Sequence, residues 1–186
     1  AEIRSDLGIY SDSPEYIRAY TDNEGKFLFG IKSDGSIEWA KGIPTPIKDI
    51  IDSDESLLMK SIAYGRFDIA KYLLENGAKV NIISKNGNNE LHCLSYHLKE
   101  VGALEIGYML LKRGVDLNKK DKKFNNSAFW YLCYNAQLSP TTAICEFISY
   151  CLDKNPDLDT PNFAGKTVNS LIMGSEELQH LLRKDV

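Results

Sequence analysis

The sequence has no excess of basic residues and no long apolar run. Its 22 lysines and arginines are outnumbered by 26 aspartates and glutamates, which gives a formal net charge of −4 at pH 7. Because a nucleic-acid-binding domain usually carries a basic face, we predict no nucleic-acid partner. The purely apolar stretches, such as residues 57–59, fall far short of the roughly 18 residues that a membrane-spanning helix needs. We therefore predict no membrane partner.

Cysteine is scarce, and its spacing offers no redox or metal motif. The chain has four cysteines and no C-x-x-C pair, with the cysteines among apolar or aromatic neighbours at Cys93, Cys133, Cys145 and Cys151. We interpret them as reduced, buried side chains rather than as a disulfide scaffold. Unpaired cysteines, without a signal or transmembrane segment, favour a cytoplasmic location. The chain begins with Ala1 rather than Met, so we expect that it is processed or trimmed.

Recognisable catalytic and cofactor motifs are also missing. The sequence contains no phosphate-binding glycine loop, no G-x-S-x-G and no H-E-x-x-H. His92, Cys93 and His97 lie close together, and either a metal or nucleophile site or a structural role would account for them. No further ligand follows at a recognisable spacing, which favours the structural role. We predict that the chain is not an enzyme and binds neither a metal nor a cofactor.

The most informative feature is a segment that occurs three times. Leu73-Leu74-Glu75-Asn76-Gly77 returns as Leu110-Leu111-Lys112-Arg113-Gly114, and a degraded copy around 151–159 carries Asn155 at the glycine position. The spacings are 114 − 77 = 37 and 155 − 114 = 41 residues. Such a period predicts stacked helix pairs, because a single repeat cannot bury its apolar face alone. We expect a left-handed C-terminal cap at each glycine and at Asn155.

The repeated segments resemble ankyrin repeats, whose pattern includes T-P-L-H, then L-L-x-x-G-A-x-V-N and a G-x-T hairpin opening. Residues 73–81 match the middle of that pattern, residues 89–92 stand at the T-P-L-H position, and Gly165-Lys166-Thr167 opens a last copy. The resemblance implies a hydrogen-bonding role for the ring of His92. It also implies an ankyrin-repeat domain over 44–186, with four repeats at about 54–84, 85–118, 119–159 and 160–186. Thr45 and Pro46 favour the start of a short helix, so we predict a cap helix at 46–52.

Residues 1–43 alternate between apolar and polar side chains, as β-strands do. Loops that end in glycine, at residues 23–25 and 33–35, predict two hairpins and hence a three-stranded antiparallel β-meander. The turn geometry pairs Ala19 with Phe29 and Phe29 with Trp39. This register would place one apolar set on one face: Ile17, Ala19, Phe29, Ile31, Ile37 and Trp39. The predicted fold class is therefore mostly α, an ankyrin solenoid preceded by a small β-meander.

The predicted meander is too small to be stable alone, so its apolar face needs a cover. Residues 1–13, the following helix or a second copy of the chain could each supply that cover. The stretch 27–46 is also similar to short β modules in bacterial and phage fibre-like proteins. One functional hypothesis is therefore a structural or assembly protein that forms a homo-oligomer through the N-terminal module.

The other hypothesis is a non-enzymatic protein-interaction module, which the resemblance to ankyrin repeats implies. Its partner would be another protein, bound by the concave groove and hairpin tips. The residues that we predict to bind it are Lys85, Asn88, Tyr96, Lys122, Phe124 and Asn125. Tyr64, Tyr96 and Tyr134 fall at groove positions, although core packing would also account for each. The lysines at 119–123, which surround Asp121, form either a solvated tip or a contact for an acidic partner.

Overall fold

The computed structural model describes residues 16–21, 27–32, 37–39, 55–75 and 77–183, and the predicted cap helix at 46–52 lies outside these residues. The chain divides into two compact units, Ala1–Ser53 and Asp54–Val186. In the first unit, three strands form an antiparallel sheet in the order β1-β2-β3. Their bounds are β1 Tyr16–Thr21, β2 Phe27–Lys32 and β3 Ile37–Trp39.

The predicted β-meander needs correction. Ala19 lies opposite Gly30 and Tyr20 lies opposite Phe29, so the predicted Ala19–Phe29 pair is wrong. Irregularities between Tyr16 and Arg18, and between Tyr20 and Thr21, shift the β1–β2 register. Because a one-residue slip moves side chains to the opposite face, the predicted shared apolar face does not exist in that form. Residues 55–75 and 77–183 form helices and contain no strand, and the fold class is mostly α.

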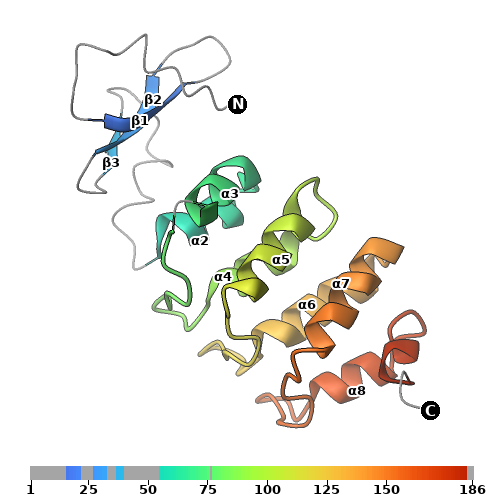
Figure 1. Cartoon of the computed structure of the whole chain (residues 1–186). Helices are drawn as coiled ribbons and strands as arrows, with labels where there is room; N and C mark the ends of the chain where they lie inside the picture. The colour runs from blue at the N-terminus through green and yellow to red at the C-terminus, as the bar shows by residue number, and fades with distance from the viewer. Residues whose placement is uncertain (1–15, 22–26, 33–36, 40–54, 76, 184–186) are drawn as a thin grey trace. The chain divides into compact units, whose positions relative to one another are not determined.

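The second unit consists of helix pairs stacked side by side (Figure 1). The first helices of successive pairs form one layer and the second helices form another. The first layer contains α2 Leu57–Ala63, α4 Glu90–Leu94 with the 3₁₀ turn η1 Ser95–His97, α6 Ala128–Leu138 and α8 Val168–Met173. The second layer contains α3 Phe67–Glu75, α5 Ala103–Lys112 and α7 Thr142–Leu152, while the 3₁₀ turn η2 Gln179–Arg183 contacts α8.

Local sequence explains where the first helices begin and the second ones end. The side-chain N-caps of α2, α4, α6 and α8 are Ser56, Asn89, Ser127 and Thr167. Each accepts hydrogen bonds from backbone N–H groups that the helix leaves unpaired. After the second helices, Gly77 and Gly114 have φ of 82° and 76°, and Asn155 has φ of 52°. The predicted left-handed caps are therefore confirmed.

The core lies between the two helix layers and continues from one repeat to the next. Its largest fully buried side chains include Leu58, Leu91, Phe129 and Phe147. Gly107 on α5 lies directly against the ring of Phe147, so a bulkier residue would not fit there. Stability therefore arises at the interfaces between neighbouring repeats, as the sequence period implies.

Polar side chains also join the repeats along their loops. Asn81 accepts a hydrogen bond from the Asp116 amide at 2.8 Å and donates one to the Gly114 carbonyl at 2.9 Å. One repeat later, Asn118 accepts from the Asp157 amide at 2.8 Å. These asparagines satisfy backbone groups of the following repeat, and the hydrogen bond from the aspartate amide recurs because the sequence repeats.

Two of the four cysteines, Cys133 and Cys151, are fully buried, while Cys93 and Cys145 are partly buried. Burial raises the pKa of each of the four thiols, to about 12 for Cys93. Such thiols are protonated at neutral pH and make poor nucleophiles. Among the helices in the described part of the chain, none has the length and hydropathy needed to cross a bilayer.

Candidate partner-binding groove

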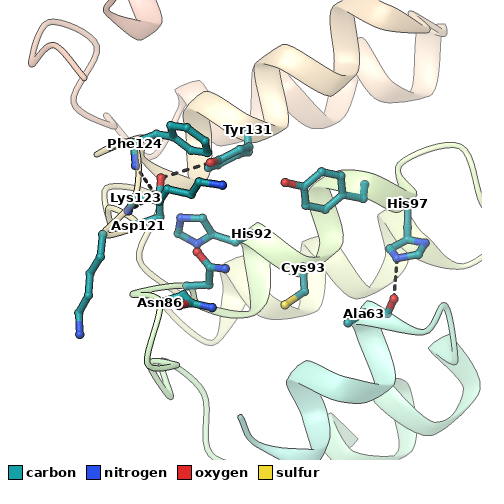
Figure 2. A pocket seen from close by; sticks show the side chains of 12 residues that line it. Ala63, Asn86, His92, Cys93, His97, Asp121, Lys123, Phe124 and Tyr131 are labelled. Carbon is teal, nitrogen blue, oxygen red and sulfur yellow. Dashed lines mark hydrogen bonds between the residues drawn. The ribbon is translucent and has the colours of Figure 1, made fainter. Parts of the chain in front are cut away.

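A hollow of about 780 Å³ lies where two hairpin tips overhang the first helices of the second and third repeats (Figure 2). We define the two tips as residues 84–88 and 121–126, each closed by a backbone hydrogen bond between its end residues. The hollow, called the groove below, is lined by Ala63, Asn86, Asn88, His92, Cys93, Tyr96, His97, Asp121, Lys122, Lys123, Phe124 and Tyr131.

The second tip is organised by one carboxylate. Asp121 is 5% exposed and accepts hydrogen bonds from the backbone amides of Lys123, Phe124 and Asn126 at 2.8, 2.7 and 3.0 Å. The hydroxyl of Tyr131 on α6 donates to the same carboxylate at 3.3 Å, as the dashed lines in Figure 2 show. Asp121 therefore holds the tip against the groove floor, and its acceptor sites are occupied internally.

Substituting Asp121 with alanine should destabilise the protein by about 2 kcal/mol, because three backbone amides lose a charged acceptor. The measurement is urea unfolding followed by circular dichroism. Asp153→Ala is the matched control, since Asp153 is exposed at the end of α7. We expect that control to change the unfolding free energy by less than about 0.5 kcal/mol. Equal effects of the two substitutions would contradict the role given to Asp121.

His92 is a buried, neutral histidine. Its Nδ1 accepts a hydrogen bond from the Asn89 amide at 3.1 Å, and the Asn89 side chain accepts from the amides of Leu91 and His92 in return. Burial lowers the pKa of His92 to about 4. Nδ1 also lies 2.9 Å from Oδ1 of Asn89, and burial outweighs a backbone hydrogen bond with Asn126 that favours the charged ring. The ring thus caps α4, in agreement with the role implied for it.

The neighbouring polar groups are also committed to structure. His97 bonds to the Ala63 carbonyl through Nε2 at 3.0 Å and to Glu100 through Nδ1 at 2.7 Å, which ties the second repeat to the first. Cys93 lines the groove, with its thiol pKa raised to about 12 by burial. In the part of the chain that the structure describes, no group of three or more metal-ligating side chains converges. This geometry favours the structural interpretation of His92, Cys93 and His97.

Aromatic side chains dominate the open part of the groove. Tyr96 is 66% exposed and Phe124 is 49% exposed. The ring of Tyr131 lies 6.2 Å from Tyr96 and 5.5 Å from His92, between centroids. The groove therefore offers exposed rings above a buried polar framework, an arrangement that suits a bound chain better than a reaction.

Comparison with known proteins agrees with this architecture. The family model described as ankyrin repeats (3 copies) matches residues 35–121. Over an aligned stretch of 73 residues, the chain is also 36% identical to the putative ankyrin repeat protein FPV233 of fowlpox virus (strain NVSL). The chain contains ankyrin repeats. The fowlpox match covers 39% of this chain and 14% of the viral protein.

Two helix pairs lie beyond the matched residues. The pairs α6–α7 and α8–η2 follow residue 121 and continue the same stacking. In the third tip, residues 162–166, the closing backbone hydrogen bond joins residues four positions apart, as in the first tip. In the second tip it joins residues five positions apart. The second tip is therefore one residue longer than the other two.

The groove unites four of the six predicted binding residues: Asn88, Tyr96, Lys122 and Phe124. Lys85 is exposed on the first tip but does not line the groove. Asn125 faces a separate, small cleft toward the third tip, where its side chain donates to the Pro161 carbonyl at 3.4 Å. Tyr64 and Tyr134 are exposed but also lie outside the groove lining.

Sequence reasoning missed Tyr131 and the carboxylate of Asp121. A signal for Tyr131 existed: its offset from the N-cap Ser127 equals that of Cys93 from Asn89. Superposing the repeats by their N-caps would thus have placed Tyr131 on the groove floor. Asp121 carried no such signal, because its neighbours in sequence suggested a solvated basic tip.

Proposed function

We propose that this protein binds a partner protein through the groove and the two overhanging tips, without catalysing a reaction. Ankyrin repeats indicate a protein-interaction module. The observation that carries the finer proposal is the exposure of Tyr96 and Phe124 over a hollow in which the Asp121 carboxylate and the His97 ring are already hydrogen-bonded. Aromatic side chains in such positions bury much area on binding and lose little conformational entropy.

Chemical arguments favour binding over catalysis at this groove. Catalysis would need a nucleophile or a base with a suitable pKa close to the opening. His92 has a pKa of about 4 and is 2% exposed, and the Cys93 thiol has a pKa of about 12. Asp121 is occupied by three amides and a hydroxyl. The groove thus supports recognition by shape and aromatic contact.

Assembly through residues 1–43 has no comparable support. That hypothesis required an apolar sheet face built by pairing Ala19 with Phe29. The register observed between β1 and β2 removes this pair. We therefore locate the proposed interaction in the repeats.

The proposal predicts that single substitutions in the groove weaken binding. Peptides selected from a random displayed library against the whole chain supply the ligands, and fluorescence anisotropy gives their Kd. We expect Tyr96→Ala and Phe124→Ala each to raise the Kd about tenfold, because each removes an exposed aromatic contact area from the groove.

Phe163→Ala is the matched control for this experiment. Phe163 is 73% exposed on the third tip and does not line the groove. The control should bind the selected peptides with unchanged affinity. If the selected peptides keep their affinity for both groove variants, the groove is not the binding surface.

A further inference from the structure

Two lysines at the edge of the groove have no charge partner among the described residues. Lys122 and Lys123 are exposed on the second tip and line the groove. The ion pairs between described residues include neither of them. Their ammonium groups are therefore available to a ligand that approaches the groove.

The one acidic residue within the lysine cluster does not compensate them. Asp121 is 5% exposed, and its oxygens accept from three backbone amides and the Tyr131 hydroxyl. Hydrogen bonds from Thr160 are the main cause of the lowered pKa of Asp157, and the charge of nearby Lys120 adds a smaller contribution. The groove edge thus keeps a local positive charge on a chain whose net charge is −4.

Basic and aromatic groups are adjacent at this edge. The Nζ of Lys123 lies 4.8 Å from the centroid of the Phe124 ring, within the range of a cation–π contact. Tyr96 and Tyr131 continue the aromatic surface toward the groove floor. A ligand that fills the groove would therefore meet ammonium groups at its edge and ring faces inside it.

We propose that the partner presents an acidic peptide segment that contains an aromatic or large apolar side chain. Its carboxylates would lie against Lys122 and Lys123, and its apolar side chain would pack on Tyr96 and Tyr131. This inference rests on the proposed function and names the chemistry of the partner. On a chain whose net charge is −4, this positive edge would attract such a segment and orient it in the groove.

A nucleic acid fits these observations less well. Affinity for a phosphate backbone arises from many lysines and arginines spread over one face. Here two exposed lysines stand at the edge of one hollow in an acidic protein. An acidic peptide with an aromatic side chain would also contact the aromatic surface next to the lysines.

The test measures fluorescence anisotropy of three labelled peptides on the full chain. One is a short peptide of aspartate and glutamate around a central phenylalanine. In the second, every carboxylate is replaced by the corresponding amide, and in the third the phenylalanine is replaced by serine. We expect the acidic aromatic peptide to bind at least about tenfold more tightly than either variant peptide. We also expect its affinity to fall as salt rises from about 0.05 M to about 0.5 M.

Charge reversal in the protein supplies the matched control. Lys122→Glu with Lys123→Glu should weaken the acidic peptide about tenfold or more, while the arginine pair at these positions should retain binding. Lys79→Glu with Lys99→Glu changes the net charge equally, at exposed positions outside the groove lining, and should have little effect. Unchanged thermal unfolding would show that the variants are folded.

The outcomes separate this inference from the proposed function. Equal binding of the acidic and amide peptides, or equal effects of the two charge-reversed pairs, would overturn the acidic partner. If library-selected peptides still depend on Tyr96 and Phe124 in that case, the groove remains the binding surface. Tighter binding of a single-stranded oligonucleotide than of the acidic peptide would also overturn the inference.

Discussion

Substituting Gly107 with valine should destabilise the helical unit by about 3 kcal/mol, near the upper end for overpacking in a core. Gly107 lies in α5 and is buried. A Cβ atom at this position would lie 2.6 Å from Cζ and 2.7 Å from Cε2 of Phe147, and 3.0 Å from Cδ2 of Leu94. Phe147 and Leu94 are both fully buried, so neither ring nor methyl group can move away without disturbing the neighbouring repeat.

For the smaller substitution Gly107→Ala, helix propensity alone would predict an increase in the free energy of unfolding. Glycine inside a helix costs about 1 kcal/mol relative to alanine, so an exposed Gly→Ala change is usually stabilising. At Gly107 we expect Gly107→Ala to be destabilising, because the contact with Phe147 outweighs that gain. Urea unfolding followed by circular dichroism measures both variants.

A double variant identifies the contact responsible. Phe147→Leu removes the ring atoms that meet the new Cβ, at the cost of part of the buried contact area. We expect Gly107→Ala to be less destabilising in the Phe147→Leu background than in the natural chain. Additive effects of the two substitutions on the free energy of unfolding, or a stabilising Gly107→Ala, would show that contact with the Phe147 ring does not determine the effect of a side chain at position 107.

Acidification should destabilise the protein through His92 by up to about 3 kcal/mol. His92 is 2% exposed, and burial lowers its pKa from 6.5 to about 4. The unfolded chain therefore binds a proton at a higher pH than the folded chain does. Stability that His92 contributes is fully present above pH 6.5 and is lost as the pH falls toward 4.

The measurement compares the natural chain with His92→Gln by urea unfolding at several pH values. Near neutral pH we expect the variant to be less stable, because the ring no longer caps α4. The difference should shrink as the pH falls from 6.5 to 4, since only the natural chain loses the contribution of a neutral histidine. Parallel stability curves for the two proteins would contradict this expectation.

The buried carboxylate of Glu90 changes stability with pH in the opposite direction from His92, but its contribution is the same in both proteins. Glu90 is fully buried, and burial raises its pKa, although hydrogen bonds from the amides of Asn81 and Ile82 favour the charged form. A raised folded-state pKa adds stability at low pH that is lost as the pH rises through that pKa. Because Glu90 is present in both proteins, the difference between them reports on His92.

Local features of the sequence allowed a correct prediction of the repeats. The 37-residue spacing of Gly77 and Gly114, with Asn155 next in the series, located the ends of second helices, and all three residues adopt left-handed conformations. Turn residues and helix caps act within a few positions, so sequence alone reveals them. The β1–β2 pairing failed for the opposite reason, because a bulge depends on the paired strand as well as on the turn.

The lining of the groove could be predicted only in part. Tyr96, Lys122 and Phe124 line it, as their places in the repeat indicate, whereas Asn125 faces the third tip because its own tip is one residue longer. That these residues bind a partner stays a prediction.

The sequence by itself determined the repeat family, the helix pairs and the positions of their caps, since these follow from periodicity and from side chains close in the chain. Tertiary structure alone decided which residues meet across repeats. It placed Phe147 against Gly107, and it turned Asp121 inward to hold a tip and Tyr131. Such contacts join residues ten to forty positions apart, and their existence depends on how neighbouring repeats pack.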